Sequence, residues 1–148
     1  MSGEERKPVA GLRSPRVEVG GLVYFGRMVD KLRLEQAGAL PEDYRENMGK
    51  GFDQACVNFL GVGYEKLRER VRQGGSDEEI LDWCGVKGKA KDAEERKVWG
   101  AYLAKRGWRD EMADRLDFRK KEAGWEGRSE IQTFFDYIDA DEGRCGRG

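Results

Sequence analysis

The chain has 148 residues, enough for one domain with a single hydrophobic core. Charged residues make up 39% of it, but the 28 basic and 29 acidic residues nearly cancel, which argues against a dedicated nucleic-acid or membrane binder. Histidine is absent, and this excludes Ser-His-Asp and Cys-His catalysis, HExxH zinc sites and Glu-x-x-His di-iron sites within the chain. We therefore predict no catalytic residue, no metal ligand and no cofactor, while leaving open whether the protein is an enzyme.

The cysteines and the N-terminal segment indicate a cellular compartment. The first residues, MSGEERKPVAG, contain acidic side chains and no apolar run, so we expect no secretory signal. The three cysteines, an odd number without CxxC spacing, are typical of reduced thiols. They are Cys56, Cys84 and Cys145. The sequence thus predicts a soluble cytoplasmic protein.

The first predicted elements are an arm and a long helix. Residues 1–11 are polar and contain Pro8, which predicts a flexible N-terminal arm. Gly20 and Gly21 would each cost a helix interior about 1 kcal/mol, so the first main helix is expected to begin at about Gly21. Its buried face is predicted from residues that recur at three- and four-residue steps. These are Leu22, Phe25, Val29 and Leu32.

A long connection is expected over residues 39–51, and glycines separate the helices predicted after it. Ser76, with Glu79 three residues later, forms a capping box and marks the clearest helix start. A last helix is expected to begin at Ser129. The predicted helices between these points cover approximately 53–60, 64–73, 77–84, 92–106 and 110–123.

The helix pattern predicts the fold class. No stretch shows sustained two-residue alternation between turn signals, so we expect no sheet. The prediction is a compact all-α single domain of about six or seven helices over residues 12–144, followed by a loose tail at 145–148.

The aromatic residues suggest which surfaces are buried. In the helix over 92–106, four residues are expected to face inward, namely Val98, Trp99, Tyr102 and Leu103. Trp83 is also assigned to the core. Trp108 and Trp125 each follow a helix-ending glycine and are expected to be partly exposed, where tryptophan is a favoured interface anchor. They favour a surface for a protein partner, including a second copy in a homodimer.

Four motifs in the chain resemble one family. They are LRSPRxxxGGxxxxxRxxDKxR from residue 12, FLGVxYExL at 59–67, GGSDEEILDWC at 74–84 and IQTFFDYIDADEGR at 131–144. In these motifs the chain resembles a bacterial family known as domain of unknown function 5069, from about Leu12 to Arg144. The resemblance implies a small soluble bacterial protein, and it brings no known activity, cofactor or catalytic residue.

The two ends of the chain carry opposite charge. Residues 126–142 hold six acids and one arginine, a net charge of −5, and residues 12–34 hold five bases and two acids, a net charge of +3. Acids at a helix C-terminus oppose the helix dipole, so they need a cationic partner. The first hypothesis is that the two segments meet as charge-assisted pairs. The residues assigned to these structural ion pairs, besides the N-terminal arginines, are Arg33, Asp136, Asp139 and Asp141.

The second hypothesis assigns the basic segment to a ligand. Arginines before a helix N-terminus, together with a Gly-Gly segment whose N–H groups can approach an anion, would form a phosphate or carboxylate site. The candidate ligand-binding residues are Arg13, Arg16, Arg27, Asp30 and Lys31. The sequence therefore predicts a binding or structural interaction module whose Arg-rich first helix pairs with an acidic last helix. The alternative is a protein or enzyme that binds a small anion.

Overall fold

The computed structural model describes residues 8–144, so most of the predicted N-terminal arm and all of the predicted tail, including Cys145, lie outside the described residues. The described part is mainly helical, with two very short strands. In chain order the elements are β1 (Glu18–Val19), β2 (Leu22–Val23), α1 (Phe25–Gln36), α2 (Glu42–Arg45), α3 (Phe52–Leu60), α4 (Tyr64–Arg72), α5 (Asp77–Lys87), α6 (Ala93–Ala104), α7 (Ala113–Ala123) and α8 (Phe134–Asp141).

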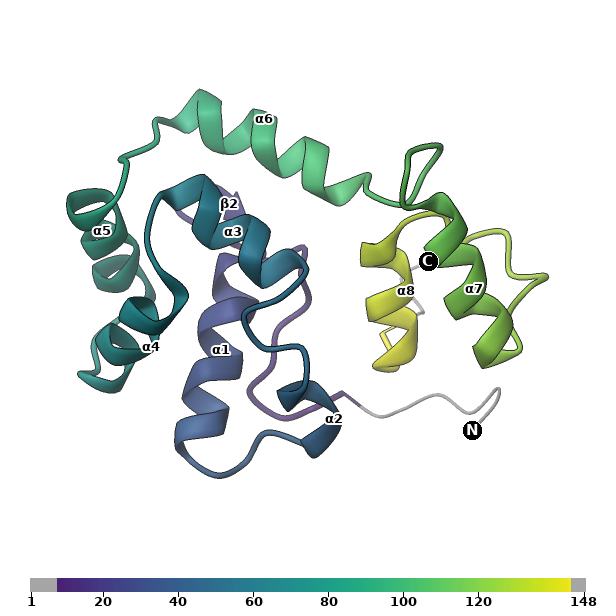
Figure 1. Ribbon diagram of the computed structural model, residues 1–148, viewed down its shortest axis with the longest axis horizontal. Helices are drawn as coiled ribbons and strands as arrows, with labels where there is room; N and C mark the ends of the chain where they lie inside the picture. Colours follow the sequence, from purple (N-terminus) through teal and green to yellow (C-terminus); the bar gives the residue numbers. More distant parts are fainter. Residues whose placement is uncertain (1–7, 145–148) are drawn as a thin grey trace.

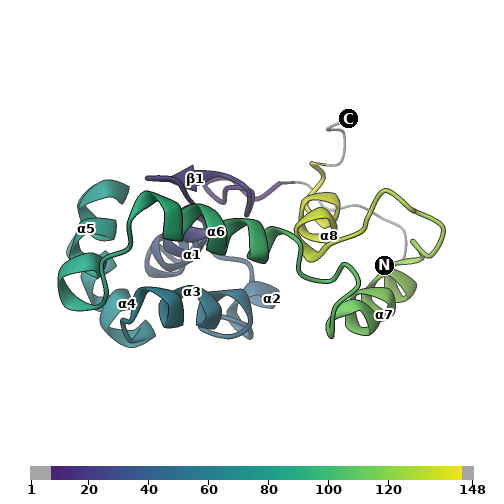
Figure 2. The same cartoon turned by 90° about the horizontal axis from the view of Figure 1, so that it is seen from above.

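The helices form a larger and a smaller group. In Figure 1, α1 to α5 make up the larger group, and α7 and α8 lie side by side in the smaller one. Helix α6 runs along one edge of the molecule in Figure 1, and Figure 2 shows from above that it connects the two groups. It packs on the strands, where the Arg96 Nη1 donates to the Gly20 carbonyl at 2.7 Å.

The main hydrophobic core lies around α1. Its fully buried side chains include Leu22, Phe25, Met28 and Leu32 from the N-terminal region. Phe135 of α8 is also fully buried and belongs to this core, which joins the smaller group to the larger one. A second, smaller cluster of Trp125, Ile131 and Ala140 lies within the smaller group.

The fold is mainly helical as predicted, but the prediction that it contains no sheet was wrong. Glu18 pairs with Val23 and Val19 with Leu22 in an antiparallel hairpin. Its two-residue loop is Gly20-Gly21, with φ of 57° and 79°, and a hairpin loop in which both residues have positive φ favours glycine. Consequently α1 begins at Phe25 and not at about Gly21.

The helix count was also wrong, because residues 8–144 contain eight helices. The additional helix is α2, which lies within the predicted connection over 39–51. The capping box at Ser76 is confirmed. The last helix begins later than Ser129, since Thr133 and Asp136 form its capping box.

Three predictions about burial were wrong. Val98 and Tyr102 were expected to face inward, but they are 59% and 55% exposed. Helix α6 carries apolar residues on two faces, and only the face with Leu103 is covered. Trp125 is buried because it packs on Tyr137, whereas Trp108 is partly exposed as expected.

Candidate functional site

The first candidate region is the set of charged residues around α1. Arg13 lies before the strands and faces α1, where its Nε and Nη2 donate to the Asp30 carboxylate at 2.9 Å each. Its Nη1 donates to Asp77, the first residue of α5, at 2.8 Å. Arg33 donates to the same carboxylate at 2.8 Å. These contacts tie the segment before β1 to both α1 and α5.

A glycine makes the position of Arg13 possible. A Cβ atom at Gly26 would lie 2.9 Å from the Arg13 Cζ, so any larger residue there would displace the guanidinium group. The hydrogen bond from Arg13, opposed by partial burial and assisted by Arg33, lowers the pKa of Asp77. The Asp77 carboxylate is therefore ionised, and its two oxygens accept hydrogen bonds from Arg13 and Arg33.

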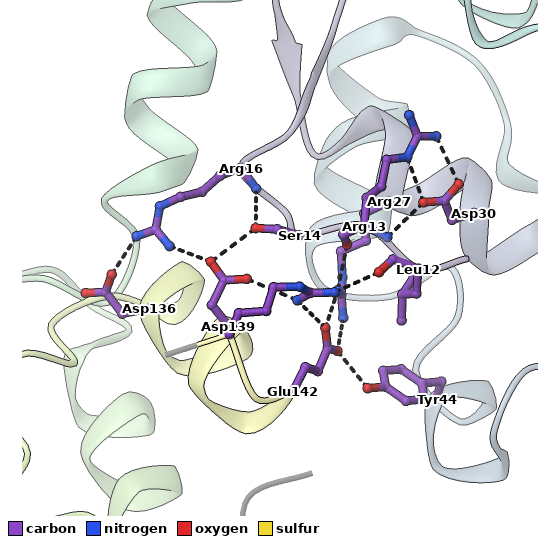
Figure 3. Close-up of polar contacts among 11 residues, drawn as sticks. Leu12, Arg13, Ser14, Arg16, Arg27, Asp30, Tyr44, Asp136, Asp139 and Glu142 are labelled. Atoms are coloured by element: carbon purple, nitrogen blue, oxygen red, sulfur yellow. Dashed lines mark hydrogen bonds and ion pairs between the residues drawn. The ribbon is translucent and has the colours of Figure 1, made fainter. Parts of the chain in front are cut away.

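Arg16 and Arg27 contact the acidic end of the chain. The Arg16 guanidinium lies between two carboxylates of α8, pairing with Asp136 and donating to Asp139 at 2.8 Å (Figure 3). Arg27 donates from Nη1 and Nη2 to the two oxygens of Glu142 at 2.9 and 2.7 Å. A bidentate arrangement of this kind is among the stronger charge-assisted interactions.

The Arg27–Glu142 pair is buried, and Glu142 has further hydrogen-bond partners. Arg27 is 4% exposed and Glu142 is 1% exposed. Glu142 also accepts hydrogen bonds from the Tyr44 hydroxyl at 2.6 Å and from Arg144 at 2.6 Å. Burial acts to raise the pKa of Glu142, but the hydrogen bonds and charge of Arg27, with Tyr44 and Arg144, lower it below 4.5. Glu142 thus joins α1, α2 and the end of α8 as an anion.

A second buried polar cluster lies between α1 and α3. Lys31 pairs with Asp53 at 2.9 Å, and the Tyr24 hydroxyl donates to the same carboxylate oxygen at 2.7 Å. The Asp53 carboxylate also accepts from the Gly49 N–H at 2.9 Å. Burial lowers the pKa of Lys31, and the Asp53 charge opposes that effect. Tyr24 has a φ of 71°, an uncommon backbone conformation for a non-glycine residue.

This cluster has the residue types of an acid–base site, but its side chains are not accessible to a substrate from solvent. Tyr24 is 3% exposed, Lys31 is 7% exposed and Asp53 is completely buried. Tyr24 is further enclosed by the rings of Phe52 and Phe135, at 5.7 and 6.4 Å between centroids. The arrangement therefore supports a structural role, in which Asp53 neutralises a lysine inside the core.

The outer surface of α6 is different because its side chains are apolar and exposed. Phe59 of α3 stacks on Trp99 of α6, with ring centroids 4.6 Å apart and an interplanar angle of 12°. We call the open depression beside this stack the α6 groove. It is lined by Phe59, Glu94, Glu95, Val98, Trp99 and Tyr102.

Comparison with family models identifies the protein family. A model of a domain of unknown function, DUF5069, matches residues 9–144. The chain belongs to this family. The family predicted from the four motifs is thereby confirmed. No curated protein matches the chain.

The helices that the structure describes in this DUF5069 protein are too short or too polar to cross a membrane. None of those between residues 8 and 144 combines the length and the apolar composition that a bilayer-spanning helix needs.

The structure divides the predicted ligand-binding residues among three places. Arg13 and Asp30 lie together with Asp77, Arg16 and Arg27 lie against α8, and Lys31 lies inward against Asp53. Each of the four cations has a carboxylate partner within 2.9 Å. A cavity beside α8 is lined by Arg16, Arg128 and Arg144, but three acids line it as well, Glu130, Asp136 and Asp139.

The residues assigned to ion pairs are also separated. Asp136 and Asp139 contact Arg16, whereas Arg33 contacts Asp77 and not the end of the chain. Asp141 is the half-buried last residue of α8. Asp53 and Asp77 were not among the site residues predicted from the sequence. For Asp53 a signal was present, since it lies on one helical face with Cys56, Val57 and Leu60.

Proposed function

We propose that this protein is a protein-binding module and that it binds its partner through the exposed surface of α6. The observation that carries the proposal is the exposure of Val98 and Tyr102, at 59% and 55%, beside the apolar α6 groove. Exposed apolar surface with a polar rim is typical of sites of protein interaction. Glu94 and Glu95 supply that rim.

The composition of the groove supports a protein partner. Trp and Tyr are enriched among the residues that dominate binding energy at protein interfaces, and the groove contains Trp99 and Tyr102. The stack of Trp99 on Phe59 also holds the groove in one shape before binding. A site that is already ordered loses less conformational entropy when a partner binds.

The charged residues in α1 and in the segment before β1 support a different role. Arg13, Arg16, Arg27 and Lys31 are each neutralised by a carboxylate of another part of the chain. We infer that they fasten the N-terminal segment, α5 and α8 to α1. In this account they hold in place the framework that presents α6.

A small-anion site at Arg13, Arg16, Arg27, Asp30 and Lys31 is the alternative, with less support. An incoming phosphate or carboxylate would have to displace a carboxylate already bound to each cation, and for Arg27 that carboxylate is buried. Displacement would take from the buried Glu142 its bidentate partner, which is costly for a buried charge.

We propose a cytoplasmic location for the protein. Cys56 and Cys84 are both buried and both free thiols. Burial raises the pKa of each thiol, that of Cys84 to about 12. Neutral, buried thiols fit a reducing compartment.

The proposal is tested by photo-crosslinking in living cells. Tyr102 is replaced by p-benzoylphenylalanine, and the matched control carries the same replacement at Phe118 of α7, which is 58% exposed. We expect a discrete crosslinked product from position 102 and none from position 118. The product should disappear when Val98→Asp is added, because a charge on the groove opposes apolar contact. No product from position 102, or the same products from both positions, would contradict the proposal.

A further inference from the structure

One face of α6 has a charge pattern that is complementary to itself. Residues at three- and four-residue steps lie on the same side of a helix. Starting from Glu94, these steps give the α6 face, which consists of Glu94, Val98, Ala101, Tyr102 and Lys105. All five are exposed, and the face points away from the buried Leu103.

The α6 face has an acid at one end, apolar residues in its middle and a base at the other end. Glu94 and Lys105 lie at equal distances from the middle of this stretch, between Trp99 and Gly100. Within residues 8–144 neither of the two forms an ion pair with another side chain. Both charges are therefore available to a partner.

We propose that the partner of the α6 face is a second copy of this chain, packed with α6 antiparallel to α6. This inference rests on the proposed function and names its partner. In the antiparallel arrangement Glu94 lies opposite the partner's Lys105, and Lys105 opposite the partner's Glu94. Val98 lies opposite the partner's Ala101, a small residue that lets the two helices approach closely.

Because the proposed dimer is two-fold symmetric, the same face of α6 forms both sides of the interface. A two-fold axis between Trp99 and Gly100 brings Glu94 against the partner's Lys105 and Val98 against the partner's Ala101, as in an isologous dimer. In a parallel arrangement, Glu94 would instead lie beside the partner's Glu94, and like charges would oppose the contact. The charges therefore select both the partner and the orientation.

Charge reversal in the full-length chain tests the dimer. We expect the wild-type protein to sediment with a mass of about twice 16.9 kDa at high concentration. Glu94→Lys and Lys105→Glu should each raise the dissociation constant about tenfold, since each change affects two symmetric pairs. The double variant Glu94→Lys/Lys105→Glu should return to within about twofold of the wild type, because the pairs are restored in reverse. Glu126→Lys is the control, with the same charge change on an exposed loop, and should leave the dissociation constant unchanged.

The double variant distinguishes loss of the ion pairs between the two chains from destabilisation of α6. Both reversals oppose the dipole of α6, so a loss caused by helix destabilisation would be larger in the double variant than in either single one. Restoration in the double variant therefore supports the dimer. A double variant weaker than both single variants, or a wild type that sediments as a monomer at every concentration, would overturn it.

The crosslinking experiment distinguishes this inference from the proposed function. A product of twice the chain mass from position 102 supports both. A discrete product of another mass, together with a monomeric wild type, overturns the dimer and leaves α6 as the surface for a different protein. A monomeric wild type with no product from position 102 overturns both.

Discussion

Replacing Arg27 by alanine is expected to lower the free energy of unfolding by about 3 kcal/mol, because the change removes the bidentate partner of a buried carboxylate. That carboxylate belongs to Glu142, which is 1% exposed and would keep only its hydrogen bonds from Tyr44 and Arg144. Equilibrium unfolding in urea measures the loss. Hydrogen exchange over residues 131–142 should also increase, since Arg27 helps to hold α8 on α1.

Arg33→Ala is the matched control for this prediction. The Arg33 side chain is 36% exposed and its ion pair with Asp77 is partly solvated, so its loss should cost no more than about 1 kcal/mol. An Arg27→Ala variant as stable as Arg33→Ala, with unchanged exchange over 131–142, would show that the buried pair does not fasten α8.

The same pair gives a pH dependence that the unfolding measurement can follow. The pKa of Glu142 is lowered in the folded protein, so the folded state binds its proton less readily than the unfolded state. Its contribution to stability is therefore present above about pH 4.5, the usual value for this carboxyl group, and is lost as the pH falls through the folded pKa. Glu142→Gln should lack this part of the acid dependence.

The second large effect is expected at Asp53. Asp53→Ala would leave the buried Lys31 with only the Tyr24 hydroxyl as a hydrogen-bond partner. We expect a loss of about 3–5 kcal/mol in the free energy of unfolding, again measured in urea. Asp82→Ala, a change at an exposed acid on α5, should alter stability by no more than about 0.5 kcal/mol.

A double variant shows whether the loss comes from the unpaired lysine. Asp53→Ala/Lys31→Met removes both charges and keeps an unbranched side chain in place of the lysine. Because it removes the unpaired buried charge, it should recover part of the stability lost in Asp53→Ala. The Tyr24 hydroxyl and the Gly49 N–H still lose their acceptor, so the recovery should be incomplete. A double variant less stable than Asp53→Ala would contradict the proposed role of Asp53 in neutralising Lys31.

Local signals in the sequence were sufficient for most of the helices. The glycines that precede and follow α3 and α4, and the capping box at Ser76, act within a few residues, so the ranges 53–60 and 64–73 agree with the structure to within one residue. The opposite net charges of the two chain ends also predicted that the N-terminal arginines pair with the acidic C-terminal segment. Arg16 and Arg27 contact acids near the end of the chain, although the individual pairs did not follow from charge alone.

The parts that were missed depend on contacts between distant segments. Two-residue strands are too short to show alternation, so the Gly20-Gly21 loop was interpreted as a helix break. Asp53 and Lys31 are 22 positions apart in the sequence and become a pair only when α3 packs on α1. Similarly, α6 is apolar on two faces, and only the packing of β2 and α3 decides which one is covered.

Hydrogen exchange at two protein concentrations, chosen on either side of the dissociation constant, tests the central claim most directly. The claim is that the charged residues in α1 and in the segment before β1 hold the fold together internally, and that the α6 face is the binding surface. We predict slower exchange over residues 93–104 at the higher concentration, with equal protection of residues 25–36 at both. Unchanged exchange over 93–104, or a concentration dependence confined to residues 12–36, would contradict it.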